Sequence, residues 1–119
     1  MTARVLVADD EPGMRDTVRE ILEAAGYEVV VASDGDEALA RLGHGHFDVV
    51  LLDLRMPGRD GLSVLRTLGE ARPTVIIMTA YALEDQLQAV GAKAFAVLHK
   101  PVPVPHLLDV VGPAAGKAA

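Results

Sequence analysis

Five short, uninterrupted apolar runs recur along the chain, and they limit its possible folds more than any other feature. Each run is four residues long, and the runs cover residues 5–8, 29–32, 49–52, 75–78 and 95–98. Apolar residues in succession, without alternation, are typical of strands that helices cover on both faces. Runs of this length fall far short of the ~20 apolar residues that span a bilayer. The sequence therefore predicts a parallel sheet between two helical layers and no membrane segment.

Segments with helical periodicity lie between the runs. The first has apolar positions at a period near 3.6, and Pro12 and Gly26 suit its two ends. Asp34 and Glu37 have the spacing of a capping box at the start of the second. The predicted helices span residues 13–25, 34–42, 62–71, 83–90 and 105–111. We expect Gly112-Pro113 to end the last helix.

Strands and helices thus alternate five times, which predicts an α/β fold with a (βα)5 doubly wound parallel sheet. Right-handed crossovers restrict such a chain to few topologies, and five strands favour the order 2-1-3-4-5. In that order the first and third strands are neighbours, and ligands bind beyond their carboxyl ends. We expect one domain over residues 1–111 and a flexible tail or linker stump over residues 112–119.

Composition excludes several classes of function. The chain has 17 acidic and 11 basic residues, a net charge of -6, and no run of Lys and Arg. Direct binding of nucleic acid is therefore not expected. Cysteine is absent, which excludes disulfides, cysteine-bound zinc and thiol catalysis. Residues 1–11 lack the pattern of a secretory signal, so we expect a cytoplasmic location.

Chemically capable side chains follow the predicted strands. Asp9 and Asp10 follow the first strand, Asp53 the third, Thr79 the fourth and Lys100 the fifth. Because the carboxyl ends of parallel strands meet at one edge of the sheet, we expect a carboxylate cluster there with a hydroxyl and an ammonium nearby.

Carboxylates this close together repel one another. At ~4 Å and an effective dielectric constant of about 20, each like-charge contact costs about 4 kcal/mol. Mg²⁺ compensates such repulsion and often shares an oxygen with a phosphate, and a lysine ammonium is a point charge suited to phosphate. An aspartate in this setting can attack phosphorus. The residues therefore predict a magnesium-dependent phosphoryl acceptor site.

Residues 4–111, which carry these side chains in this order, closely resemble the receiver domain of two-component response regulators. The resemblance implies a flavodoxin-like receiver fold and a role in signal transduction and phosphorelay. The motifs that carry it are Asp9-Asp10-Glu11-Pro12, Asp53-Leu54-Arg55-Met56-Pro57-Gly58, Asp60-Gly61, Thr79-Ala80 and Lys100-Pro101.

The resemblance assigns roles to the acidic residues. It implies that Asp53 is the phosphoacceptor and that Asp10 and Asp53 bind Mg²⁺. Asp9 is implied to assist through water, and the backbone carbonyl of Arg55 completes the set of ligands. The donor is implied to be a phosphohistidine on a sensor histidine kinase or a phosphotransfer protein.

The resemblance also implies how the site is read out. Thr79 would hydrogen-bond a phosphoryl oxygen, Lys100 would pair with the phosphate, and Pro101 would follow Lys100 in a cis peptide. Many receivers carry an aromatic switch residue where this chain has Val97, and Tyr81 lies two residues beyond Thr79. The implied output surface is the face of the fourth helix, fifth strand and fifth helix, through which an effector domain or a homodimer would be engaged.

Two other functions stay open at the level of sequence. A hydrolase of the haloacid dehalogenase kind also uses an aspartate nucleophile, but it needs a second aspartate where this chain has Arg55. A phosphorylation-independent interaction module would keep the fold without the chemistry. We expect a phosphoacceptor domain, not an enzyme with an external substrate. His44 and His46 have no metal-ligand partners nearby in the sequence and indicate a solvated loop.

Overall fold

The computed structural model describes residues 2–58, 60–68, 73–80 and 88–118. Its sheet has five strands, all paired in parallel, in the order β2-β1-β3-β4-β5. The predicted α/β fold and strand order are confirmed. The strands are β1 (Arg4–Ala8), β2 (Glu28–Ala32), β3 (Val49–Leu52), β4 (Thr74–Thr79) and β5 (Ala96–His99).

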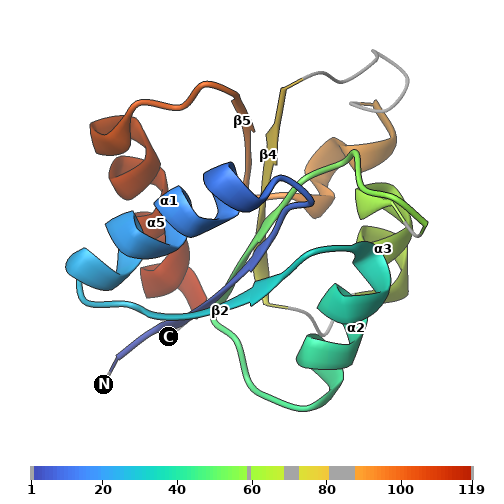
Figure 1. The fold of residues 1–119 in the computed structure, drawn as a ribbon, viewed down its shortest axis with the longest axis horizontal. Helices are drawn as coiled ribbons and strands as arrows, with labels where there is room; N and C mark the ends of the chain where they lie inside the picture. The colour runs from blue at the N-terminus through green and yellow to red at the C-terminus, as the bar shows by residue number, and fades with distance from the viewer. Residues whose placement is uncertain (1, 59, 69–72, 81–87, 119) are drawn as a thin grey trace.

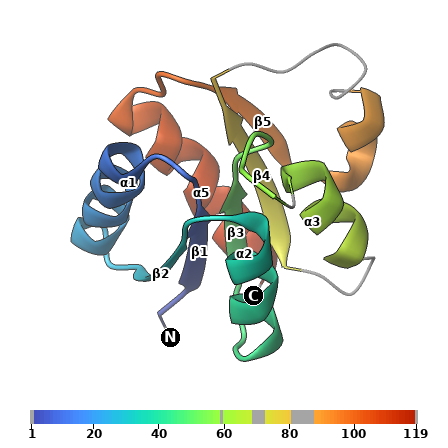
Figure 2. The same cartoon turned by 45° about the vertical axis from the view of Figure 1, so that its right-hand side comes forward.

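Helices cover both faces of the sheet. Helices α1 and α5 lie on one face, and α2 and α3 lie on the other (Figures 1 and 2). No helix within the described ranges is long and apolar enough to cross a membrane. Of the expected fourth helix, residues 88–90 are helical and the rest lie outside the described residues. The helices are α1 (Pro12–Ala24), α2 (Gly35–Gly43), α3 (Gly61–Leu68), the 3₁₀ turn η1 (Gly91–Lys93) and α5 (Val104–Ala118).

Local signals explain where two helices begin. Pro12 occupies the first turn of α1, where a missing N–H costs no helical hydrogen bond. The Asp34 side chain accepts from the backbone N–H of Glu37 at 2.7 Å, and the Glu37 carboxylate accepts from the N–H of Ser33 at 3.1 Å. The Asp34 contact satisfies a donor that the first turn of the helix leaves free, whereas the return contact of Glu37 is to the residue before the cap.

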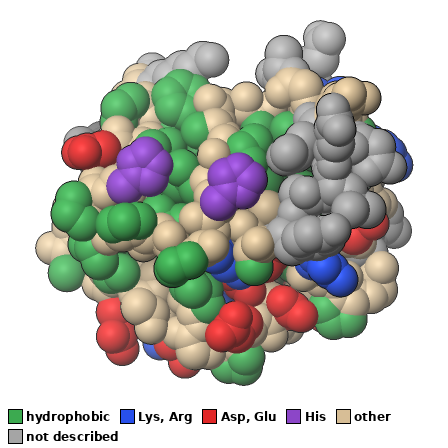
Figure 3. Space-filling view, turned by 90° about the horizontal axis from the view of Figure 1, so that it is seen from above, with side chains coloured by type: hydrophobic (Ala, Val, Ile, Leu, Met, Phe, Trp, Pro, Cys, Tyr) green, Lys and Arg blue, Asp and Glu red, His purple; other side chains and the backbone are tan. Residues whose placement is uncertain are grey.

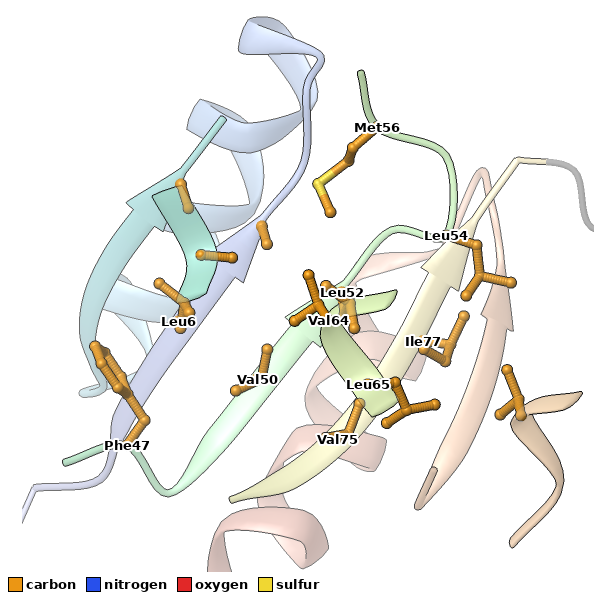
Figure 4. Packing of buried hydrophobic residues seen from close by; sticks show 14 residues of the cluster. Leu6, Phe47, Val50, Leu52, Leu54, Met56, Val64, Leu65, Val75 and Ile77 are labelled. Carbon is orange, nitrogen blue, oxygen red and sulfur yellow. The ribbon is translucent and has the colours of Figure 1, made fainter. Parts of the chain in front are cut away.

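The core has two halves, one on each face of the sheet. On the face of α2 and α3, side chains from four strands meet Val64 and Leu65 of α3 (Figure 4). The other half joins the opposite side chains of the strands to Val18 and Leu22 of α1 and to Leu107 of α5. Because both faces are buried, every strand residue from Val49 to Leu52 is apolar and buried. The polar residue that follows is held at the sheet edge.

The expected end of the last helix is wrong. Helix α5 continues through Gly112 and Pro113 to Ala118. A proline inside a helix removes one hydrogen bond and costs about 3 kcal/mol. Beyond the proline, however, Ala114 is fully buried and Ala115 packs against the α1 side of the core. We attribute the continued helix to this burial.

Candidate functional site

The acidic cluster lies where β1 and β3 end side by side. Ala8 pairs with Leu52 in the register of these strands, so Asp9 and Asp53 leave the sheet at the same level. The N–H of Asp53 donates to the carbonyl of Ala8 at 3.0 Å, which extends the ladder by one step. Asp9 is 1% exposed and Asp53 is 6% exposed. The strand register therefore holds two carboxyl groups close together and away from bulk water.

Asp10 completes the cluster from the solvent side. One oxygen from each of Asp9, Asp10 and Asp53 lies within 4.8 Å of the other two, and only Asp10 is exposed. Three carboxylate oxygens with an open side match the preference of Mg²⁺ for hard oxygen ligands and retained waters. The structure thus brings together the three carboxylates that the sequence singled out.

Lys100 reaches this cluster from the edge of the sheet. Its Nζ atom donates to Oδ2 of Asp9 at 2.6 Å and to Oδ2 of Asp53 at 2.9 Å. Lys100 follows β5, and β4 lies between β5 and β3, so the long side chain crosses the end of one strand. Only 8% of the side chain is exposed. The ammonium offsets charge that two buried carboxylates would otherwise leave unpaired.

The charge state of Lys100 follows from these contacts. Desolvation is the largest single influence and lowers its pKa. The hydrogen bonds to Asp9 and Asp53 and the negative charges of the two carboxylates act the other way. Together they outweigh the burial, and the pKa of Lys100 lies above its ordinary value of 10.5. The side chain is therefore an ammonium at neutral pH.

Each buried carboxylate is fixed through its second oxygen by its own loop. Oδ1 of Asp9 accepts from the backbone N–H of Glu11 at 3.0 Å, and Oδ1 of Asp53 accepts from the N–H of Arg55 at 3.0 Å. Both are contacts to the residue two positions on, the geometry of an Asx turn. In each carboxylate one oxygen thus orients the loop and the other faces Lys100.

Among the remaining predicted residues, Thr79 and Pro101 lie at the same end of the sheet. Thr79 ends β4 and is fully buried, and its carbonyl accepts from the N–H of Lys100 at 2.9 Å. The peptide bond from Lys100 to Pro101 is cis. Val97 is half-buried in β5 and packs against the α3 side of the core. Tyr81 lies outside the described residues.

Two contacts were not anticipated from the sequence. Arg15 of α1 donates from its guanidinium to the backbone carbonyl of Asp9 at 3.0 Å. Gly61, the first residue of α3, lies so close to the loop after β3 that a Cβ atom there would overlap the carbonyl of Asp53. Helix periodicity does not signal either contact, because both depend on how α1 and α3 approach the strand ends.

A shallow hollow opens beside the cluster. Its lining includes Asp10, the loop after β3 and Asp60. Seen from above the molecule, acidic side chains lie next to basic ones along the lower part of the face (Figure 3). The exposed carboxylate of Asp10 is therefore reachable by an incoming anionic group, provided that cations offset the charge.

Several regulators are similar to this chain in sequence. A response regulator receiver protein of Anaeromyxobacter sp. (strain Fw109-5) is 37% identical over 110 residues, covering 90% of this chain and 46% of that protein. The transcriptional regulatory protein ResD of Bacillus subtilis (strain 168) is 40% identical over 91 residues, covering 76% of this chain and 38% of ResD. The chain spans less than half the length of these relatives.

Solved structures agree with the sequence relatives. The receiver domain protein (CheY-like) of Methanospirillum hungatei JF-1 has a TM-score of 0.94 and 29% identity, covering 99% of this chain and 97% of the other. The response regulator TrrA of Thermotoga maritima, solved in complex with Mg²⁺ and BeF, has a TM-score of 0.86 and 32% identity. The likeness to TrrA covers 95% of this chain and 99% of the TrrA chain.

The family model for the response regulator receiver domain matches residues 5–112, nearly the whole chain. Its match, the relatives and the solved structures agree with the fold. This chain belongs to the response regulator receiver domain family.

Proposed function

We propose that Asp53 accepts a phosphoryl group in a Mg²⁺-dependent reaction, and that the donor is a phosphohistidine of a sensor histidine kinase or phosphotransfer protein. The observation that carries the proposal is the position of the Lys100 ammonium, bonded at once to Asp9 and Asp53 beside the exposed Asp10. A structural ion pair needs only one carboxylate. Three carboxylates and one ammonium leave an excess of negative charge at an open edge, which suits a divalent cation that can in turn accept an anionic phosphoryl group.

The transfer step needs a carboxylate that is already oriented. One oxygen of Asp53 forms a bond to phosphorus while the phosphorus–nitrogen bond of the donor breaks, and the imidazole leaves with the electron pair and takes a proton from solvent. The Arg55 N–H holds Oδ1 of Asp53 at 3.0 Å, so the carboxylate does not rotate freely before attack. Positioning of this kind is the main contribution a protein makes to phosphoryl transfer.

The residues present fit a divalent cation. Asp10 and Asp53 would bind Mg²⁺ directly, Asp9 through water, and the backbone carbonyl of Arg55 would complete the protein ligands. Bound there, Mg²⁺ supplies positive charge that neutralises the phosphoryl oxygens. Asp9 and Asp53 each have an oxygen on the side of Lys100, which keeps both carboxylates turned toward this edge.

Lys100 and Thr79 serve the phosphoryl group. Transfer places new anionic oxygens next to the Lys100 ammonium, which can exchange a carboxylate contact for one to phosphate. Thr79 ends the neighbouring strand in a fully buried position, and its hydroxyl can donate to a phosphoryl oxygen. Because the Lys100 N–H is bonded to the Thr79 carbonyl, movement of one residue is transmitted to the backbone of the other.

We propose that phosphorylation changes the conformation of the surface formed by the fourth helix, β5 and α5, and that this change is the output signal. That face would engage an effector domain or a second copy of the chain, in the cytoplasm and without direct contact to nucleic acid or membrane. Curated relatives named as transcriptional regulators are longer than this chain. Their extra length is consistent with effector domains that read this face.

The experiment is phosphorylation followed by intact-mass measurement. The protein is incubated with acetyl phosphate, with and without Mg²⁺, and we expect a gain of one phosphoryl group only with Mg²⁺. Asp53→Asn should abolish the gain. Asp16→Asn, which removes an exposed carboxylate of α1, should leave it intact. A phosphoryl group that still appears in Asp53→Asn, or none in the wild type, would contradict the proposal, and the latter favours an interaction module without this chemistry.

A further inference from the structure

A second hollow lies at the opposite edge of the sheet, where the strands begin. It has a volume of about 450 Å³, within the range of roughly 300–1,000 Å³ typical of small-molecule pockets. Its lining comes from the start of β1, from β2, from the last turns of α2 and from the loop that leads into β3. None of these segments contributes to the acidic cluster around Asp53, so the hollow is a separate feature.

The floor of this hollow is apolar and rigid. Phe47 is 5% exposed and lies at the margin of the core, next to Leu6 (Figure 4). The Arg4 guanidinium lies 4.7 Å from the centre of the Phe47 ring, a cation–π distance that fixes the ring from one side. Val30 and Ala40 complete the floor. Since alanine is short, α2 leaves space above the ring.

Two arginines line the hollow, although the chain has a net charge of -6. Arg4, Arg41 and His44 line the hollow, and Glu37 is the acidic residue among its lining residues. Arg4 already has partners, because its Nε lies 3.3 Å from Oε1 of Glu28 and its guanidinium donates to the carbonyl of His46 at 3.0 Å. The cation that remains available is on α2.

Arg41 is that cation. It follows Glu37 by four residues, the spacing at which a glutamate and an arginine of one helix often pair. Glu37, however, turns back to accept the N–H of Ser33. Within the ranges that the structure describes, the Arg41 guanidinium forms no ion pair or hydrogen bond. An unpaired guanidinium at the mouth of an apolar hollow is suited to an anion that carries an apolar body.

We propose that this hollow binds a small organic anion. Its carboxylate or similar head group lies against Arg41 and His44, and its apolar body lies against Val30, Ala40 and the part of Phe47 that lines the hollow. The Arg41 guanidinium and the apolar lining together favour this class over inorganic anions and over neutral apolar molecules. The site is independent of phosphorylation at Asp53.

The test uses phenylbutyrate as the probe and follows the amide signals of the protein by NMR. We expect saturable shifts at Arg41, His44 and Phe47. Phenylbutanol has a similar apolar body without the charge, and inorganic phosphate has the charge without the body. Both should bind at least about fivefold more weakly than phenylbutyrate, since a partly exposed charge contact and a covered ring each contribute on that scale.

Two variants separate charge from shape. Arg41→Glu should weaken phenylbutyrate binding by about fivefold or more, whereas Arg66→Glu, which reverses an arginine in the last turn of α3, should not. Ala40→Phe fills the hollow without a change of charge and should abolish binding, whereas Ala24→Phe adds the same ring to an exposed alanine of α1 and should not. The amide spectrum of each variant shows whether it is folded.

Three outcomes would overturn the proposal. Equal binding of phenylbutanol, unchanged binding in folded Arg41→Glu and Ala40→Phe, or shifts centred on residues outside α2 and the 44–47 loop would each contradict it. None of these outcomes depends on whether Asp53 is phosphorylated.

Discussion

The guanidinium of Arg15 donates to the backbone carbonyl of Asp9 at 3.0 Å, and this contact ties α1 to the loop that carries the acidic cluster. The backbone N–H of Asp9 donates to the carbonyl of Ala32 of β2 at 3.1 Å. The Asp9 backbone is thus held from two sides, by a neighbouring strand and by a helix. We expect Arg15 to be a positioning residue, which acts on the proposed metal ligands through the backbone that bears them.

The first prediction concerns this contact. Arg15→Gln should weaken Mg²⁺ binding by about two- to tenfold, because a hydrogen bond from a charged group contributes roughly 0.5–1.5 kcal/mol when partly exposed. Arg15→Lys should recover part of the loss. Mg²⁺ titration followed by amide shifts of residues 9–11 gives the affinity.

The control lies one turn further along α1. Arg19 forms exposed ion pairs with Asp16 and Glu23, so Arg19→Gln should leave Mg²⁺ affinity unchanged. An equal loss of affinity in both variants would show that Arg15 acts only through the stability of the helix.

The second prediction concerns Lys100 and pH. Removal of this ammonium by Lys100→Ala leaves Asp9 and Asp53 buried and unpaired, which should cost about 3–5 kcal/mol in the free energy of unfolding. Because the pKa of Lys100 is raised above 10.5 in the folded protein, its contribution is fully present below that value and is lost as pH rises through the folded pKa. Wild-type stability should therefore fall above pH 10.5, as measured by urea unfolding.

In Lys100→Ala that alkaline loss should be absent, and Mg²⁺ should restore much of the stability at neutral pH. Lys93→Ala, at an exposed position of η1, is the matched control and should keep the alkaline loss. A Lys100→Ala variant as stable as the wild type without Mg²⁺ would show that the ion pairs contribute little.

The third prediction concerns the approach of α3 to the loop after β3. Gly61→Ala places a methyl group against the carbonyl of Asp53, so backbone must move, at a cost of about 1–3 kcal/mol. Phosphorylation should slow as well, since the shifted backbone carries the acceptor. Gly13→Ala has open space around it and lies inside α1, where it should stabilise by about 0.5–1 kcal/mol. Urea unfolding and the rate of mass gain with acetyl phosphate measure both effects.

The fourth prediction concerns α5. Pro113 lies inside the helix, so Pro113→Ala restores a hydrogen-bond donor and should stabilise the protein by up to about 3 kcal/mol. Thermal unfolding of the two proteins measures the difference. No change in stability would indicate that residues 112–118 fray in solution despite their helical form.

Strand pattern and strand order predict well which side chains meet at the sheet edge, because the carboxyl ends of parallel strands lie at the same edge in every such sheet. Asp9 and Asp53 follow buried runs on neighbouring strands, so their proximity follows from the order alone. The contact of Lys100 with both carboxylates depends on the length of its side chain and on the position of β5. From the sequence, that position is known only approximately.

Other features depend on packing that no local pattern encodes. Arg15 falls on the polar side of an amphipathic helix, where most arginines are solvated. Nothing in the sequence around Gly61 indicates that this residue lies against a backbone carbonyl. Gly112-Pro113 is a strong stop signal, and burial of Ala114 overrides it. Tyr81, two residues beyond Thr79 in the sequence, lies outside the described residues.

The fifth prediction concerns output. Val97 packs its short, β-branched side chain into the core on the α3 side, and it has neither a ring to swing nor a polar tip to expose. Thr79 is bonded through its carbonyl to the N–H of Lys100 at 2.9 Å. A signal from phosphorylated Asp53 should therefore travel through the backbone after β4 and into β5, not through a side-chain rotation at position 97.

Amide NMR of the beryllofluoride complex, a mimic of phosphorylated Asp53, tests this route. We expect large shifts at Ala80 and Val90 and smaller ones in α1. Thr79→Ala should reduce the shifts at Val90, because it removes the hydroxyl that follows the phosphoryl group. Val97→Ala should leave them nearly unchanged, although loss of a partly buried side chain costs some stability. If Val97→Ala blocks the response while Thr79→Ala does not, the signal travels through the side chain of β5, and the backbone route is wrong.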